Sequence, residues 1–135
     1  MGIARVQVLH EYVAVSGTGY AFTSNNTAGN FLVVSVVGAD NITPSPSIAV
    51  SDSQGNTYTA LTLAIYGVLN GSLTQMFYAP NIKGGANSVK ATVAGVGDLG
   101  FTAVEYSGIK VSSPLDTQPS AVISATEMSP VSSRR

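Results

Sequence analysis

The sequence predicts an all-β protein, a β-sandwich of jelly-roll type with about eight antiparallel strands. Short apolar runs rich in Val, Ile, Thr, Tyr and Phe alternate with clusters of Gly, Asn, Pro and Asp, which is typical of strands and turns. No segment holds the i, i+3, i+4, i+7 apolar spacing of an amphipathic helix. The 135 residues, 44% of them hydrophobic, are enough for one domain with its own core.

The first half of the chain contains four expected strands. Residues 6–15 and 19–23 form the first two. Residues 31–37 (FLVVSVV) are almost continuously apolar, which predicts a central strand buried on both faces. A Pro-rich connection over residues 43–46 leads into a strand over residues 47–51.

A hairpin is expected over residues 57–78, with strands 57–69 and 72–78. Asn70-Gly71 favours a two-residue type I′ turn, because both central positions need positive φ. Such a loop would pair Tyr66 with Gln75. Because successive side chains of a strand point to opposite faces, one face of this hairpin is expected to belong to the core. This expected core face comprises Leu61, Leu63, Ile65, Met76 and Tyr78.

Two further strands complete the domain. Residues 88–93 alternate cleanly, so Val89, Ala91 and Val93 are expected inside. Residues 99–106 form the last strand. The domain is expected to span residues 1–116, followed by a Ser/Pro-rich tail over 117–135. The apolar run at 121–123 in this tail is expected as an edge strand or as a strand exchanged with a neighbouring molecule.

The composition excludes several classes of function. Only 10% of the residues are charged and the net charge is −1, so the chain lacks the basic patch of a nucleic-acid binder. There is no cysteine, which excludes disulfides, thiolate metal sites and a cysteine nucleophile. No apolar run approaches the length of a membrane span, and no signal peptide follows Met1. Low charge and unpaired sheet edges favour a homo-oligomer.

The second face of the expected hairpin is the candidate ligand site. It combines aromatic rings with amide and hydroxyl groups, and sugars bind such faces because rings cover C–H patches while polar groups bond hydroxyls. Alternatively, Phe77 packs against a second sheet and Tyr66 is a half-exposed strand residue. The candidate residues are Thr62, Tyr66, Gln75 and Phe77.

A calcium site is the second hypothesis. Asp52 and Asn56, with Asp116 or Asp40, could supply the oxygen ligands that calcium prefers, although their spacing matches no EF-hand. Alternatively, these residues form a turn without metal. No other cofactor is expected.

No catalytic motif is present, and the protein is not expected to be an enzyme. Glu11 and Glu105 could act as a glycosidase pair only if the fold brought their carboxylates to about 5–5.5 Å, as in retaining enzymes. His10 is the only histidine. It cannot form an ordinary zinc site by itself, and its strand neighbour Glu11 points to the opposite face. His10 is therefore expected to be an ordinary strand residue.

Four segments, in order, resemble a β-domain that is repeated in secreted and surface proteins of environmental bacteria. They are residues 28–34 (AGNFLVV), 50–58 (VSDSQGNTY), 77–87 (FYAPNIKGGAN) and 105–116, which contains EYSG and SPLD. The resemblance implies a secreted or cell-surface sandwich module for surface attachment or carbohydrate binding, without catalytic residues. Because such domains continue further, the chain resembles a half-length version that completes its core by self-association. The Gly and Asn residues of these segments also suit turns, where Asn side chains bond local backbone.

Three functions follow, in order of preference. The first is a non-catalytic binding or adhesion module of a bacterial extracellular protein, with a glycan or another surface component as its partner. The second is a self-assembling structural module joined by edge strands or by the tail. The third is an enzyme acting on polysaccharide.

Overall fold

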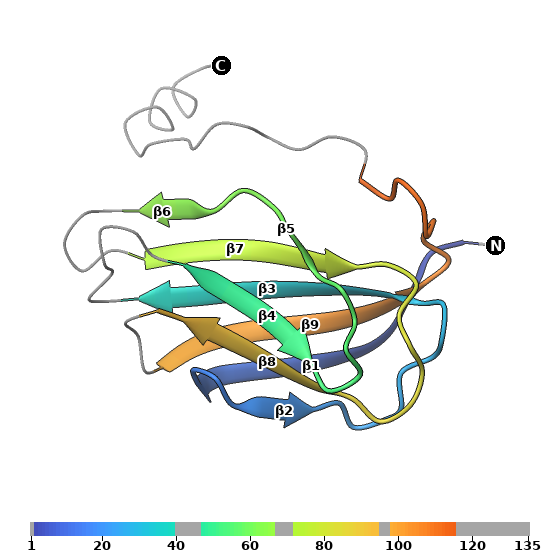
Figure 1. Cartoon of the computed structure of the whole chain (residues 1–135), viewed down its shortest axis with the longest axis horizontal. Helices are drawn as coiled ribbons and strands as arrows, with labels where there is room; N and C mark the ends of the chain where they lie inside the picture. Colours follow the sequence, from blue (N-terminus) through green and yellow to red (C-terminus); the bar gives the residue numbers. More distant parts are fainter. Residues whose placement is uncertain (1, 40–46, 67–71, 95–97, 116–135) are drawn as a thin grey trace, which may run out of the picture.

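The computed structural model describes residues 2–39, 47–66, 72–94 and 98–115. Two antiparallel sheets form a β-sandwich (Figure 1), and these residues contain no helix. The predicted all-β sandwich is therefore confirmed, while its jelly-roll topology stays a prediction. The tail over 117–135, including the run at 121–123, lies outside the described residues.

The larger sheet has six strands and the smaller sheet has three. The larger sheet has the order β1 (Ala4–Val15), β9 (Asp98–Ser107), β3 (Phe31–Ala39), β7 (Ser72–Ala79) and β5 (Thr59–Ala60), and β6 (Ala64–Tyr66) also pairs with β7. The smaller sheet has the order β2 (Gly19–Ala21), β8 (Ser88–Val93) and β4 (Ile48–Asp52). In Figure 1, β4 and β8 cross over the larger sheet.

The core lies between the two sheets. Alternate residues of β3, β7 and β9 face β8, whose Val89, Ala91 and Val93 are buried as the alternation predicts. The rings of Tyr20 and Phe101 meet across the core with their centroids 5.9 Å apart. Burying these side chains supplies the main stabilisation of the fold, since each large apolar side chain contributes about 1.5–3 kcal/mol.

Strand β3 is central in its sheet but is not buried on both faces. Leu32, Val34 and Val36 are buried in the core, whereas Val37 on the outer face is exposed. Phe31, on the same outer face, is buried, so the prediction of burial on both faces holds at the start of β3 but is wrong at Val37. The smaller sheet covers only the inner face of the larger sheet, and an apolar run does not show which face that is.

The predicted hairpin register was also wrong. Tyr66 lies opposite Ser72 rather than Gln75, so residues 67–71 separate the paired positions. The expected strand 57–69 is divided into β5 and β6. In β7 the two faces are reversed: Phe77 is in the core with 4% exposure, whereas Met76 on the outer face is 43% exposed. The observed register differs from the predicted one by three residues, and a slip by an odd number of residues exchanges the two faces of a strand.

Candidate functional site

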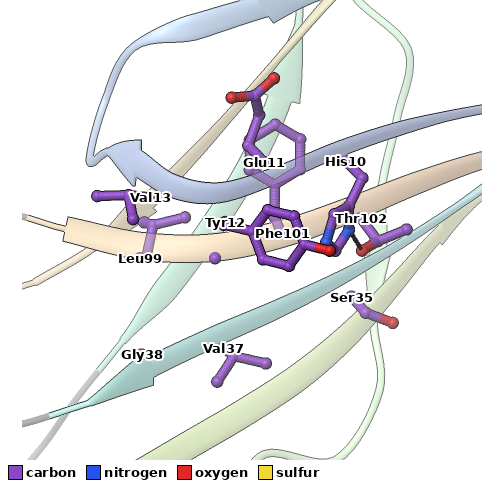
Figure 2. Close-up of a pocket in the computed structure, with 11 residues that line it drawn as sticks. His10, Glu11, Tyr12, Val13, Ser35, Val37, Gly38, Leu99, Phe101 and Thr102 are labelled. Carbon is purple, nitrogen blue, oxygen red and sulfur yellow. Dashed lines mark hydrogen bonds between the residues drawn. The ribbon is translucent and has the colours of Figure 1, made fainter.

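A groove of about 540 Å³ lies on the outer face of the larger sheet (Figure 2). Strands β1, β3 and β9 form it, and they are adjacent in the sheet. Its volume is in the range of about 300–1,000 Å³ that is usual for small-molecule sites. Its lining includes the side chains of His10, Tyr12, Ser35, Val37 and Thr102.

A β-bulge gives the groove its aromatic wall. The pairing of β1 with β9 shifts register between Glu11 and Ala14, and Tyr12 within this bulge is 84% exposed. Bulges redirect side chains away from the regular alternation. Gly100 lies on the facing strand, and a Cβ atom there would be 3.3 Å from the Tyr12 carbonyl oxygen. The missing side chain therefore leaves room for both the bulge and the hollow.

His10 connects the aromatic wall to a hydroxyl group. Its Nδ1 atom is hydrogen-bonded to Thr102 Oγ1, and its ring meets the Tyr12 ring edge-on with the centroids 4.3 Å apart. Within the described ranges, Nε2 has no hydrogen-bond partner. The hydrogen bond and the ring contact hold the imidazole in place, which leaves Nε2 for a ligand.

The side chains that face the groove carry no formal charge when His10 is neutral. Glu11 belongs to the lining, but Figure 2 shows its carboxylate pointing away from His10 and Tyr12. This orientation confirms that His10 and Glu11 form no local dyad. An aromatic ring, an imidazole and two hydroxyl groups beside Val37 favour an uncharged, amphipathic ligand.

A second polar centre lies inside the sandwich, around Glu105. This side chain is 0% exposed. Its Oε1 atom accepts hydrogen bonds from Thr27 N and Asn30 Nδ2, both at 2.8 Å. Its Oε2 atom accepts from Gln7 Nε2 at 2.7 Å and Asn26 Nδ2 at 2.8 Å. Burial raises the pKa of this carboxyl group, but the four hydrogen bonds outweigh burial and hold the pKa below its usual range.

Asparagine side chains extend this centre to the smaller sheet. Asn87 Nδ2 donates to Asn26 Oδ1 at 2.8 Å and to Asp52 Oδ2 at 3.0 Å. Because Asn26 also donates to Glu105, a continuous chain of hydrogen bonds runs from Glu105 on β9 to Asp52 on β4. We call these four residues, Glu105, Asn26, Asn87 and Asp52, the polar bridge. They tie the two sheets together at one end of the sandwich.

Asp52 is the most heavily bonded member of the polar bridge. Besides Asn87, it accepts hydrogen bonds from Gln54 N, from Asn56 N and Nδ2, and from the Tyr58 hydroxyl at 2.7 Å. Burial raises the Asp52 pKa, but these hydrogen bonds outweigh burial and lower it. Burial and the neighbouring Asp52 carboxylate raise the pKa of Tyr58, which therefore stays protonated and donates.

These bonds give the calcium candidates a structural role. The Asp52 oxygens accept five hydrogen bonds, and Asn56 Oδ1 accepts one from Lys83 N at 2.9 Å. No group of three His, Cys, Asp or Glu side chains that could hold a metal occurs among the described residues. Asp116 and Asp40 lie outside these residues, so a calcium site that includes either of them stays a prediction.

The structure does not bring the predicted sugar site together on one open face. Phe77 is a core residue. Gln75 donates from Nε2 to the Leu61 carbonyl oxygen at 2.7 Å, and Thr62 is an exposed residue between β5 and β6. Tyr66 lies at the end of β6. The alternative hypothesis, that Phe77 packs against the second sheet, describes its observed position.

The two glutamates are too far apart for a glycosidase pair. Glu11 lies opposite Phe101, whereas Glu105 lies opposite Gln7. Four residues along the strand correspond to roughly 14 Å, because a strand rises about 3.4 Å per residue. Inverting glycosidases need about 6.5–9.5 Å and retaining enzymes less. This geometry does not support the hypothesis of a polysaccharide-active enzyme that uses these two residues.

Sequence reasoning missed the groove because its residues come from three strands. It treated His10 as an ordinary strand residue and did not consider Tyr12. One signal was available: residues 12–15 (YVAV) interrupt the alternation of apolar and polar side chains in the predicted strand 6–15, and a bulge is one cause of such an interruption.

Comparison of the chain with protein-family models, with curated proteins and with solved structures gave no match. The resemblance to repeated bacterial surface domains stays a prediction. Within the part of the chain that the structure describes, no helix is long and apolar enough to cross a membrane.

Proposed function

We propose that this protein is a non-catalytic binding module for a neutral carbohydrate, with the outer-face groove as its binding site. The observation that carries the proposal is the exposed ring of Tyr12 beside the hydrogen-bonded pair of His10 and Thr102. A sugar ring has apolar C–H faces and a rim of hydroxyl groups. The Tyr12 ring suits the C–H face, while His10 Nε2 and the hydroxyls of Ser35 and Thr102 suit the rim.

Two further features support a neutral ligand. Among the described residues, no charged side chain points into the groove, and only 10% of the chain is charged. An anionic ligand would be expected to meet Lys or Arg side chains, whereas an entirely apolar ligand would cover His10 Nε2 without giving it a hydrogen-bond partner. The resemblance to bacterial surface domains points to the same function and to an extracellular location.

Binding of the protein to an array of immobilised neutral oligosaccharides tests the proposal. The affinity of each oligosaccharide that binds is then measured by titration calorimetry. Tyr12→Ala is expected to weaken binding about tenfold or more, because an aromatic contact residue at the centre of a site contributes over about 1.4 kcal/mol. Tyr12→Phe keeps the ring and is expected to retain most of the affinity. Thr102→Val removes the hydroxyl group at nearly constant shape and is expected to weaken binding less than Tyr12→Ala does.

Val111→Ala is the matched control, since Val111 is exposed and lies outside the groove lining. It is expected to bind as the wild type does. The proposal is wrong if no neutral glycan binds, or if a bound glycan has the same affinity for wild type and Tyr12→Ala.

A further inference from the structure

An apolar cavity of about 300 Å³ lies on the outer face of the larger sheet, beside the groove. All ten residues that line it are apolar or aromatic, and the Tyr78 hydroxyl is the only O–H or N–H group among their side chains. Its floor includes Val33 on β3 and Met76 and Tyr78 on β7. Such a lining suits a ligand group that forms no hydrogen bonds, because a buried polar group without a partner is costly.

The residues that follow β9 form a wall of this cavity. Ile109, Pro114 and Leu115 belong to its lining. Gly108 has a φ of 83°, and a Cβ atom at this position would collide with the Gly2 carbonyl oxygen. Glycine therefore lets the chain turn here and pass close to the N-terminal residues, which brings the wall over the outer face.

The cavity adjoins the groove at Ser35. Ser35 lines the groove, while Val33 and Met76, its neighbours on the same face, line the cavity. Val33 lies two residues away along β3, which corresponds to about 7 Å. Met76 lies directly opposite Ser35 on β7, where side chains approach to about 5 Å. Only a small serine side chain separates the two hollows at this point, so one molecule can extend from the groove into the cavity.

We infer that the cavity binds the alkyl chain of a neutral glycolipid whose sugar lies in the groove, and the position of the sugar rests on the proposed function. His10, Thr102, Ser35 and Met76 form one row across β1, β9, β3 and β7. Three strand spacings of about 4.8 Å make this row roughly 14 Å long. A sugar ring that carries a short alkyl chain can span it, with its polar end at His10 and its apolar end at Met76.

The surroundings of the cavity favour an alkyl chain over a segment of protein. Every peptide residue except proline brings an N–H and a C=O group, and both need hydrogen-bond partners when they are buried. The main chain of β3 is paired with β7 and β9, and that of β7 with β3, β5 and β6. The cavity floor therefore offers no free strand edge to a peptide. An alkyl chain needs none, and its burial is favourable by itself.

Titration calorimetry with the full chain tests the inference, using methyl and octyl glycosides of glucose, galactose and mannose below their critical micelle concentrations. For a sugar that the groove accepts, the octyl glycoside is expected to bind about tenfold or more tightly than the methyl glycoside, because each buried methylene group raises the affinity about two- to fourfold. Leu115→Asp places a carboxylate in the cavity wall and is expected to reduce this ratio of affinities below about threefold.

Val111→Asp is the matched control, because Val111 is also exposed, follows β9 and lies outside both linings. It is expected to keep the wild-type ratio. Met76→Asp places the same charge on the cavity floor and is expected to lower the ratio as Leu115→Asp does. Circular dichroism shows whether the three variants are folded. A ratio near one in the wild type, or a ratio that both cavity variants leave unchanged, overturns the inference.

Binding of 1-octanol tests the cavity without the sugar. Octanol is expected to bind the wild type and Val111→Asp equally, and Leu115→Asp about tenfold or more weakly. If no glycan binds on the array but octanol behaves in this way, the proposed function is wrong, while the assignment of the cavity to an alkyl chain is supported. If octanol does not bind, the inference is overturned even when glycans bind, and a cavity occupied by another segment of the chain or by a second copy would give this result.

Discussion

The Glu105 carboxylate is fully buried, yet all four of its hydrogen-bond donors are uncharged. A buried carboxylate usually needs a cation or a complete set of donors, because water no longer solvates it. Three side-chain amides and one backbone N–H supply that set here. The donors come from β1 and from the segment 26–30, so Glu105 holds this segment against the larger sheet.

Glu105→Gln tests this role. The carboxamide has nearly the same shape, but its NH₂ group replaces an acceptor and faces donors. We expect the free energy of unfolding to fall by about 1–3 kcal/mol, the cost of leaving a buried polar group unsatisfied. Urea denaturation measures the change. Glu11→Gln is the control, with an expected change within about 0.5 kcal/mol. Equal changes in both variants would contradict the role assigned to Glu105.

Strand β7 shows how packing decides which face of an element becomes the core. Its sequence, SLTQMFYA, has three consecutive large apolar residues, Met76, Phe77 and Tyr78, so alternation alone does not identify the buried face. In the structure, Leu73 and Phe77 face the smaller sheet, while Met76 and Tyr78 face outward. The Tyr78 ring stacks on that of Phe31, with the centroids 5.7 Å apart.

Two alanine variants of β7 distinguish the observed face from the reversed one. Phe77→Ala is expected to lower the free energy of unfolding by about 3–5 kcal/mol, because it leaves a cavity in the core. Met76→Ala is expected to change it by about 0.5 kcal/mol or less, since this side chain is exposed on the outer face. Thermal or urea unfolding of the two variants checks the difference. If Met76→Ala lowers the free energy of unfolding more than Phe77→Ala does, the buried and exposed faces of β7 are assigned the wrong way round.

In the molecule as a whole, the polar bridge connects the two sheets at one end of the sandwich. It joins β9 of the larger sheet to β4 of the smaller sheet. Both of its carboxyl groups have a pKa below the ordinary values of 3.8 for Asp and 4.5 for Glu. Its contribution to stability therefore depends on pH.

Proton binding decides whether acid raises or lowers the stability of the folded protein. In acid the unfolded chain takes up protons at these two carboxyl groups before the folded protein does, so protonation favours unfolding. The stabilisation is fully present above about pH 4.5 and is lost as the pH falls through the lowered folded pKa values. Melting temperatures measured from neutral pH down to about pH 2 are expected to fall as the pH decreases below about 4.5. In Glu105→Gln this fall is expected to be shallower, and parallel curves for the two proteins would contradict the prediction.

The sequence alone determined the fold class and most strand positions. Residues 88–93 were predicted with the correct ends and the correct buried face, because strict alternation encodes which side chains lose contact with water. Gly29, Gly55 and Gly85 were correctly expected where the backbone geometry favours glycine, since their φ values are 90°, 73° and 114°. The side chains of Asn30 and Asn87 were expected to bond local backbone, but they bond distant side chains of the polar centre instead.

Only the tertiary structure decided the register of β6 and β7, the buried face of β7 and the composition of both polar centres. His10 and Thr102 lie 92 residues apart in the chain, and Asn26 and Asn87 lie 61 residues apart. Such contacts depend on which strands are neighbours and on where a bulge shifts the alternation. The physical reason is that periodicity records the burial of each residue along its own strand, whereas the choice of partner strand results from packing the whole core.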